Sequence, residues 1–224
     1  MQGHSRKGAN PLRAFVYAII IHVAFGAMLG VSLWIQPRTI MPVEGKPVQA
    51  KAIDYLAQLP NNRDYLSLFE RNTKHMSYAI SGSSLSALSI IDPEKSLEIA
   101  DSLLPAAKNA QERSIKTVYS KYGGPDKMDY FVNLLETESN FSLFTTTGLY
   151  VDFLKNQEIN TTIKGMDALE KLSVEATSWM LWVSERLLQE MKVYFEMELK
   201  SQQDKEVKAK IEAQIERISG LLSL

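Results

Sequence analysis

The chain contains one long uninterrupted apolar run near its start, followed by apolar positions that recur at helical spacing. Residues 14–35 include no Asp, Glu, Lys or Arg, and the one side chain among them that titrates near neutral pH is His22. A membrane-spanning helix needs about 20 such residues, whereas the apolar core of a secretory signal peptide has only about 7–15. The pattern therefore predicts a transmembrane helix over residues 14–35 that anchors the chain.

One face of this predicted helix carries small residues and the histidine. Ala18, His22, Gly26 and Gly30 are spaced four apart, so they lie along the same side of a helix. Small side chains let a second membrane helix approach closely, and imidazole nitrogens within a membrane favour a hydrogen-bonding partner or a water path. We expect this face to contact a partner transmembrane helix. A polar residue tolerated in a plain anchor is the alternative interpretation of His22.

The residues that flank the run predict its orientation. Arg6, Lys7 and Arg13 precede it, and Trp34 lies at its far end, where amphipathic rings favour the membrane interface. Positive charge before a membrane helix favours a cytoplasmic N-terminus. We therefore expect residues 1–13 to be cytoplasmic and the rest of the chain to lie on the other side of the membrane.

Prolines separate the predicted anchor from the part that follows it. Pro37, Pro42 and Pro47 favour extended backbone and prevent a helix from continuing. We expect residues 36–60 to form a tether that contains these prolines. Within it, the segment 47–54 is compatible with either a short strand or the start of a helix.

From residue 61 to residue 224 the apolar positions follow a helical period, with start signals between the helices. Asp92 before Pro93 is typical of a helix start, because the carboxylate can accept from free backbone N–H groups and proline fits the first helical position. Asn109 and Glu112 resemble a capping box, which opens another helix. The whole of 61–224 is therefore expected to be one helical domain.

Alternate helices in this domain begin at regular intervals. Their predicted starts lie near residues 75, 109, 141 and 176, and separations of about 34, 32 and 35 positions are typical of stacked two-helix repeats. The sequence thus predicts an all-α protein: one N-terminal transmembrane helix, then a HEAT-like αα-repeat solenoid of four helix hairpins. An irregular helical bundle is the alternative.

Charge and composition remove several classes of function. The net charge is −1, divided into +4 for residues 1–54 and −5 for the remainder. No stretch concentrates basic residues as a nucleic-acid-binding face requires, so we expect no nucleic-acid partner. The chain has no cysteine, which excludes disulfides, thiolate nucleophiles and metal sites with cysteine ligands.

The few candidate residues for catalysis do not form a known site. The three histidines, His4, His22 and His75, are far apart in sequence, and no His-Glu-x-x-His motif is present. We therefore predict no catalytic residue, no metal ligand and no cofactor in this chain. His75 is expected on a helix, at the surface or partly buried.

Two other polar groups of residues have plain structural interpretations. The serine-rich segment 81–86 lacks the G-x-S-x-G motif of a hydrolase, so we expect its small side chains to pack between helices. Glu136 and Glu138 are expected on a solvated helix face rather than as a catalytic pair.

Residues 11–54 resemble a known membrane anchor. The matching stretches are Pro-Leu-Arg13-Ala-Phe, Ile-Ile-Ile-His22-Val and Pro47-Val-Gln-Ala-Lys-Ala-Ile-Asp54, and they are similar to the N-terminal anchor of TolA-type envelope proteins, relatives of TonB. The resemblance implies contact with the transmembrane helices of a proton-driven motor complex. His22 matches the family's histidine, whereas the serine one turn before it is Ala18 here, and the family's long Ala/Lys/Glu-rich helix is missing.

Residues 61–222 resemble a different family. The stretches that carry the likeness are Tyr78-Ala-Ile, Ala87-Leu-Ser-Ile-Ile-Asp92-Pro-Glu-Lys-Ser-Leu and Val118-Tyr-Ser-Lys-Tyr-Gly123-Gly-Pro-Asp-Lys-Met-Asp129-Tyr-Phe. They are similar to the C-terminal helical-repeat domain of aminopeptidase N-type zinc metallopeptidases, which in the intact enzymes closes over the catalytic domain. The resemblance implies an aminopeptidase catalytic domain as a partner, since the zinc motif itself is absent here.

These observations lead to one functional hypothesis and two alternatives. We expect a non-catalytic, helical-repeat binding or scaffold module, anchored by a single pass in a bacterial inner membrane with its C-terminal domain in the periplasm. The first alternative is the C-terminal part or a subunit of a zinc aminopeptidase whose catalytic domain is supplied separately. The second is a TolA-like protein that couples energy to the cell envelope.

Overall fold

The computed structural model describes residues 48–175 and 178–223, and within these ranges all regular structure is helical. The all-α prediction is therefore confirmed for this part of the chain. No helix within these ranges is long and apolar enough to cross a membrane. The predicted cytoplasmic residues 1–13, the predicted anchor 14–35 and residues 36–47 of the predicted tether lie outside the described residues.

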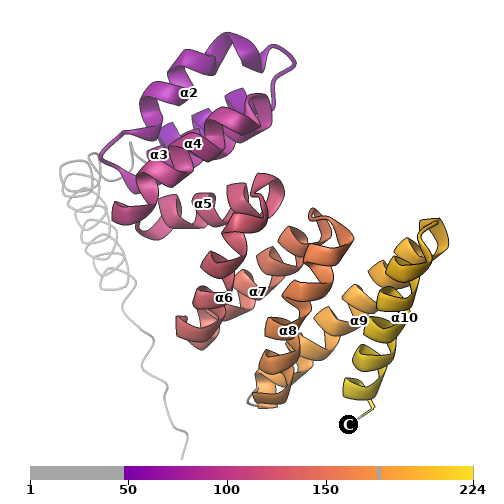
Figure 1. Cartoon of the computed structure of the whole chain (residues 1–224). Coiled ribbons are helices and arrows are strands. Elements are labelled where there is room, and N and C mark those ends of the chain that lie inside the picture. The colour runs from indigo at the N-terminus through magenta and orange to yellow at the C-terminus, as the bar shows by residue number, and fades with distance from the viewer. Residues whose placement is uncertain (1–47, 176–177, 224) are drawn as a thin grey trace, which may run out of the picture. The chain divides into compact units, whose positions relative to one another are not determined.

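The described part begins with a helix over residues 48–57, which answers the open question between strand and helix for the start of this segment. Ala50, Ile53 and Ala57 form its buried face. The elements that follow, in the order in which Figure 1 colours them, are η1 (Asn62–Tyr65), α2 (Leu66–Thr73), α3 (Tyr78–Ile91), α4 (Pro93–Leu103), η2 (Leu104–Ala106), α5 (Asn109–Tyr122), η3 (Pro125–Lys127), α6 (Met128–Thr137), α7 (Asn140–Lys155), α8 (Ile159–Glu175), α9 (Ser178–Ser201) and α10 (Lys205–Leu221).

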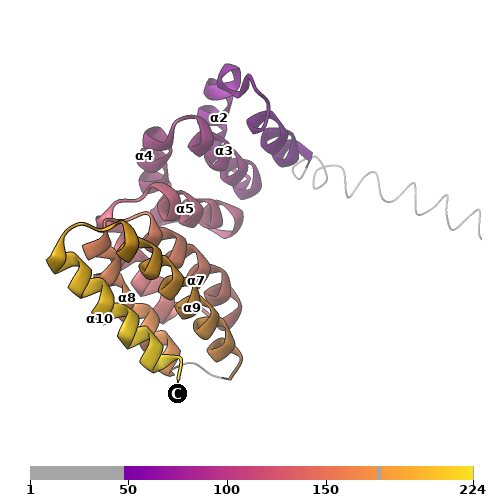
Figure 2. The ribbon, with the colours of Figure 1, turned by 90° about the vertical axis from the view of Figure 1, so that its right-hand side faces the viewer.

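Helices that alternate along the chain lie side by side within residues 50–224. Helix α3 packs against α5, α5 against α7 and α7 against α9, while α6 packs against α8 and α8 against α10. Figure 2 shows α8 and α10 together on one side and α7 and α9 together beside them. The helices of the first row begin at Tyr78, Asn109, Asn140 and Ser178, within three residues of the starts that the sequence predicts.

Of the two predicted helix-start motifs, the structure confirms one and contradicts the other. The Asp92 side chain accepts a hydrogen bond from the Lys95 backbone N–H at 3.0 Å, as expected of an N-cap before Pro93. Helix α5 does start at Asn109, but the predicted capping box is wrong. Asn109 opens the helix with a left-handed φ of 54°, no side-chain hydrogen bond caps the helix start, and Glu112 pairs with Lys116.

The serine-rich segment packs closely against α5, as the sequence predicts. A Cβ at Gly82 would lie only 2.7 Å from the carbonyl oxygen of Ala110, so the two backbones are in direct contact. The buried Ser81 hydroxyl donates to the Thr73 carbonyl and accepts from Gln111 Nε2 at 2.6 Å. Small size and hydrogen-bonding capacity together explain why these residues lie at the contact between α3 and α5.

A chain of aromatic rings joins α5, α6 and α7. Tyr119 and Tyr130 meet edge to face with centroids 5.1 Å apart, and Tyr130 contacts Phe131 in the same way at 5.4 Å. Phe131 also contacts Phe153 at 5.1 Å, and Phe153 stacks on Tyr150 at 6.1 Å. Offset and edge-to-face pairs add to the stabilisation from burial, so these rings form the centre of the core.

A polar contact at the edge of this core ties α4 to α5. The Tyr119 hydroxyl donates to Asp101 Oδ1 at 2.5 Å, and Lys127 Nζ lies 2.8 Å from the same oxygen and 5.0 Å from the Tyr119 ring centroid. Partial burial alone would raise the pKa of the Asp101 carboxyl, but the hydrogen bonds from Lys127 and Tyr119 outweigh it and hold that pKa below its usual value.

The contact between α3 and α5 gives a prediction about stability. Gly82→Ala should lower the free energy of unfolding by roughly 1–3 kcal/mol, because the new methyl group meets rigid backbone. Gly148→Ala is the matched control: it lies inside α7 with no atom within 4 Å of the added Cβ, and better helix propensity should raise stability by roughly 0.5–1 kcal/mol. Thermal unfolding of the full chain, followed by circular dichroism, measures both, and equal effects would contradict the close contact.

Candidate functional site

A groove of about 320 Å³ lies between α7 and α9. Its floor is apolar, with Leu149, Val183 and Leu187, and the large side chains at its edges are Phe144 and Trp182. Phe144 is 48% exposed and Trp182 is 62% exposed. The groove therefore presents two aromatic side chains to solvent.

Helix α9 carries apolar side chains on two sides. One side is buried in the core through Leu188, Met191 and Phe195. The opposite side also carries large apolar residues, and these are exposed: Trp182, Val193 and Met197. Single exposed apolar residues are common, but several on one helix face beside an apolar groove form the kind of patch that marks an interaction surface.

Charged side chains lie along the same groove. Asp152 of α7 and Arg186 of α9 line its wall, and Lys155 of α7 pairs with Glu190 of α9 one turn further along. Aromatic residues and arginine are the side chains that contribute most to protein interfaces. The groove thus combines apolar contact area with charges that could select a partner.

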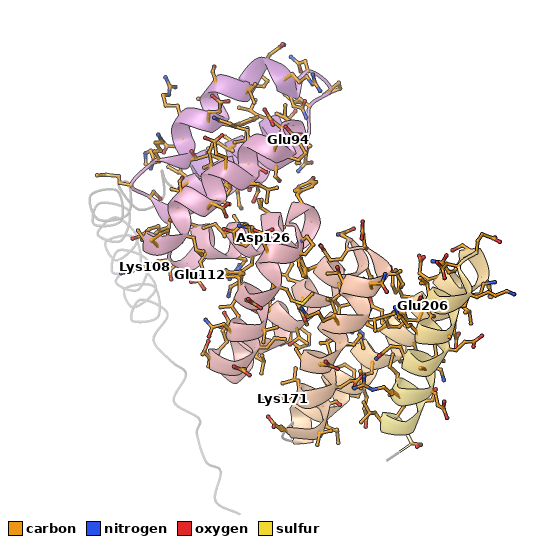
Figure 3. All side chains as sticks on the ribbon, viewed as in Figure 1. Glu94, Lys108, Glu112, Asp126, Lys171 and Glu206 are labelled. Atoms are coloured by element: carbon orange, nitrogen blue, oxygen red, sulfur yellow. The ribbon has the colours of Figure 1, made fainter. Side chains whose placement is uncertain are left out.

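A second and larger pocket, of about 670 Å³, lies between α6 and α8. Met128, Val132 and Leu135 supply its apolar lining from α6. An ion pair crosses it, because Lys171 Nζ of α8 lies 2.9 Å from Glu136 Oε1, and both side chains are more than half exposed. Figure 3 labels Lys171 near the C-terminal end of α8. The pocket is therefore partly closed by a contact within the chain itself.

The floor of this second pocket holds a polar group that is already hydrogen-bonded. The buried Tyr150 hydroxyl donates to the Gly165 carbonyl at 2.8 Å. Burial raises the pKa of the Tyr150 phenol well above its usual value, so the hydroxyl keeps its proton. A Cβ at Gly165 would overlap Leu154 and crowd Tyr150, so glycine lets α8 approach α7 here.

Glu138 corrects one prediction from the sequence. Its side chain is only 11% exposed, and it pairs with Lys116 and accepts from Thr146 Oγ1 at 2.5 Å. Lys116 also lies 3.2 Å from Glu112 of its own helix, which Figure 3 labels. The expectation of a solvated carboxylate is wrong for Glu138, because residues from α5 and α7 surround it. Its partners are 22 and 8 positions away in sequence.

The four residues predicted to contact a partner transmembrane helix lie outside the described residues; they are Ala18, His22, Gly26 and Gly30. His75 is partly buried, as expected, but it lies between α2 and α3 rather than on a helix, and its Nδ1 accepts from the Ser77 backbone N–H at 3.0 Å.

No arrangement of side chains in the described ranges points to metal chemistry. Among residues 48–175 and 178–223, no group of three or more His, Cys, Asp or Glu side chains is placed to hold a metal ion.

No family model, no curated protein and no solved structure matches this chain.

The buried ion pair gives a second prediction. Lys116→Met should lower the free energy of unfolding by about 2–4 kcal/mol, because it leaves the Glu138 carboxylate buried without a cation. Lys171→Met is the matched control and should change stability by less than about 1 kcal/mol, since its ion pair is exposed. Adding Glu138→Gln to Lys116→Met should restore part of the loss. Thermal unfolding measures all three, and equal losses for Lys116→Met and Lys171→Met would contradict this account.

Proposed function

We propose that this chain is a membrane-anchored, non-catalytic binding module that uses the groove between α7 and α9 to hold a helix of a partner protein. One observation carries the proposal: Phe144 and Trp182 are exposed at the edges of an apolar groove, next to the charged Asp152 and Arg186. Such side chains cost solubility when they stay in water, and they contribute strongly when a partner covers them.

The arrangement of the helices supports a HEAT-like solenoid as the scaffold. Alternate helices pack side by side, and the helices of one row begin at near-regular intervals along the chain. In solenoids each repeat contacts mainly its neighbours, and one row of helices commonly forms an extended binding surface. The groove between α7 and α9 belongs to such a row.

The shape of the groove favours an amphipathic helix as its occupant. Phe144 and Trp182 lie toward the N-terminal parts of α7 and α9, and the Lys155–Glu190 ion pair lies further along both helices, so the two helices run in the same direction. A helix laid along such a groove uses apolar residues at three- and four-residue spacing as anchors. The exposed charges then favour oppositely charged positions on that helix.

The anchor and its location are the second part of the proposal. The uncharged apolar run 14–35 supports a single membrane pass, and the basic residues before it support a cytoplasmic N-terminus with the helical domain in the periplasm of a bacterium.

Each of the two alternative functions is favoured by one specific observation. The likeness of residues 61–222 to a peptidase domain favours a subunit of a zinc aminopeptidase, and His22 favours TolA-like coupling.

The anchor leads to a direct test. The full chain of 25.2 kDa should stay in the membrane pellet after alkaline extraction of bacterial membranes, whereas a variant without residues 14–35 should appear in the supernatant. Immunoblots of both fractions measure the distribution. Release of the full chain together with the shortened variant would contradict a membrane anchor.

The groove is tested by photo-crosslinking in living cells. A photoreactive phenylalanine analogue placed at Phe144 or at Trp182 should trap one and the same protein. The analogue placed at Ile90 on α3, whose exposure lies between those of the two groove residues, should not. Mass spectrometry identifies the adduct. An aminopeptidase catalytic chain as the adduct would favour the first alternative, and a motor subunit trapped from position 22 would favour the second. No adduct from either groove position would contradict the binding function.

A further inference from the structure

The exposed face of α9 carries side chains at a regular spacing, of which Trp182 and Val193 are apolar and Arg186, Glu196 and Lys200 are charged. Six exposed positions follow one another at intervals of four, three, four, three and four residues: Trp182, Arg186, Gln189, Val193, Glu196 and Lys200. This spacing keeps the six side chains on one side of a helix and is the spacing by which two helices pack along a shared seam. The seam is unpartnered in the described part of the chain.

The charges along this seam complement a second copy of the same seam in reverse. In an antiparallel pair centred on residue 191, Arg186 of each copy faces Glu196 of the other. Trp182 faces Lys200, a cation over an aromatic ring, and Gln189 faces Val193. In a parallel pair each charged residue would face its own counterpart, so like charges would meet at three positions. The charge pattern therefore favours the antiparallel arrangement.

We propose that the partner helix of the groove is α9 of a second copy of this chain, packed antiparallel about a two-fold axis near residue 191. This inference rests on the proposed function, since it names the occupant of the same surface. A two-fold interface must complement itself, residue i meeting j and j meeting i. The pairs Arg186–Glu196 and Trp182–Lys200 meet that condition twice each in one dimer.

The groove beside the seam fits the same arrangement. Met197 is 64% exposed and lies on the side of α9 that faces α7, next to Lys155. Val183, on the same side of α9, lines the groove between Phe144 and Trp182. In the antiparallel pair these two flanking positions meet, so Met197 of one copy enters the groove of the other. Its flexible thioether suits an irregular apolar groove lined with aromatic rings.

The test is a pair of charge reversals measured on the full chain in detergent. Sedimentation equilibrium should show a dimer, and Arg186→Glu or Glu196→Arg should each weaken it by about tenfold or more, because two like-charge contacts replace two attractive ones. The double variant Arg186→Glu/Glu196→Arg should bring the dissociation constant back to within about threefold of the original. The matched control is Arg113→Glu/Glu212→Arg, which reverses two exposed charges on α5 and α10.

Cysteine crosslinking reports the orientation independently, because the chain has no cysteine of its own. In the antiparallel dimer two copies of Gln189→Cys lie about 6 Å apart along the axis, and two copies of Lys200→Cys lie about 27 Å apart, at a rise of about 1.5 Å per residue. A short bismaleimide should therefore link Gln189→Cys to itself and leave Lys200→Cys unlinked. Linking of both variants would show a parallel pair and overturn the proposal.

The outcomes separate this inference from the function on which it rests. A chain that is monomeric up to about 100 μM, or a dimer that neither single charge reversal weakens, overturns the second copy as occupant. The second result would place self-association elsewhere, for example on the predicted membrane helix. In both cases the photo-crosslinks from Phe144 and Trp182 test the proposed binding function independently of the dimer. An adduct with another protein supports that function, and the absence of any adduct contradicts it.

Discussion

The arrangement of α6, α7 and α8 depends on the contacts that the buried ring of Phe131 makes. It lies against Tyr130, Tyr150 and Phe153, so one buried side chain of α6 joins its own helix to α7. Tyr150 then holds α8 through the Gly165 carbonyl, and α7 provides the wall of the groove. Because these contacts are continuous, the aromatic centre of the core positions α6, α7 and α8 relative to one another.

The pocket between α6 and α8 and the groove between α7 and α9 differ in a way that bears on binding. The pocket between α6 and α8 has more volume, but the Glu136–Lys171 ion pair crosses it, and an occupant would have to displace that contact. The groove between α7 and α9 has aromatic edges, and its ion pair, Lys155–Glu190, lies beyond the aromatic end. Aromatic edges above an apolar floor release unfavourable water when a partner covers them, whereas an occupant of the pocket between α6 and α8 would only exchange one polar contact for another.

Local signals in the sequence predict most of the fold, and they fail where distant residues decide. Asp92 caps its helix through the residue three positions later, and the start of α7 at Asn140 lies one residue from the start that the helical period predicts. Glu138 looks like a surface residue in sequence, yet Lys116 and Thr146 enclose it from two other helices. The four- and three-residue spacing from Trp182 to Lys200 on α9 is also readable in the sequence. The exposure of these side chains is not, because that depends on which side of α9 the core covers.

The polar contact among Lys116, Glu138 and Thr146 has a mechanical consequence. Hydrogen bonds and ion pairs are directional, so they resist sliding of one helix along another, whereas apolar surfaces keep most of their attraction after a small displacement. The contact between α5 and α7 is therefore stiff. Between α7 and α9 the directional contact is the Lys155–Glu190 ion pair, and toward Phe144 and Trp182 the two helices meet mainly through apolar side chains, so they can separate more easily at that end. A pull on the C-terminal helices would be absorbed by widening the groove before it reached the N-terminal half of the domain.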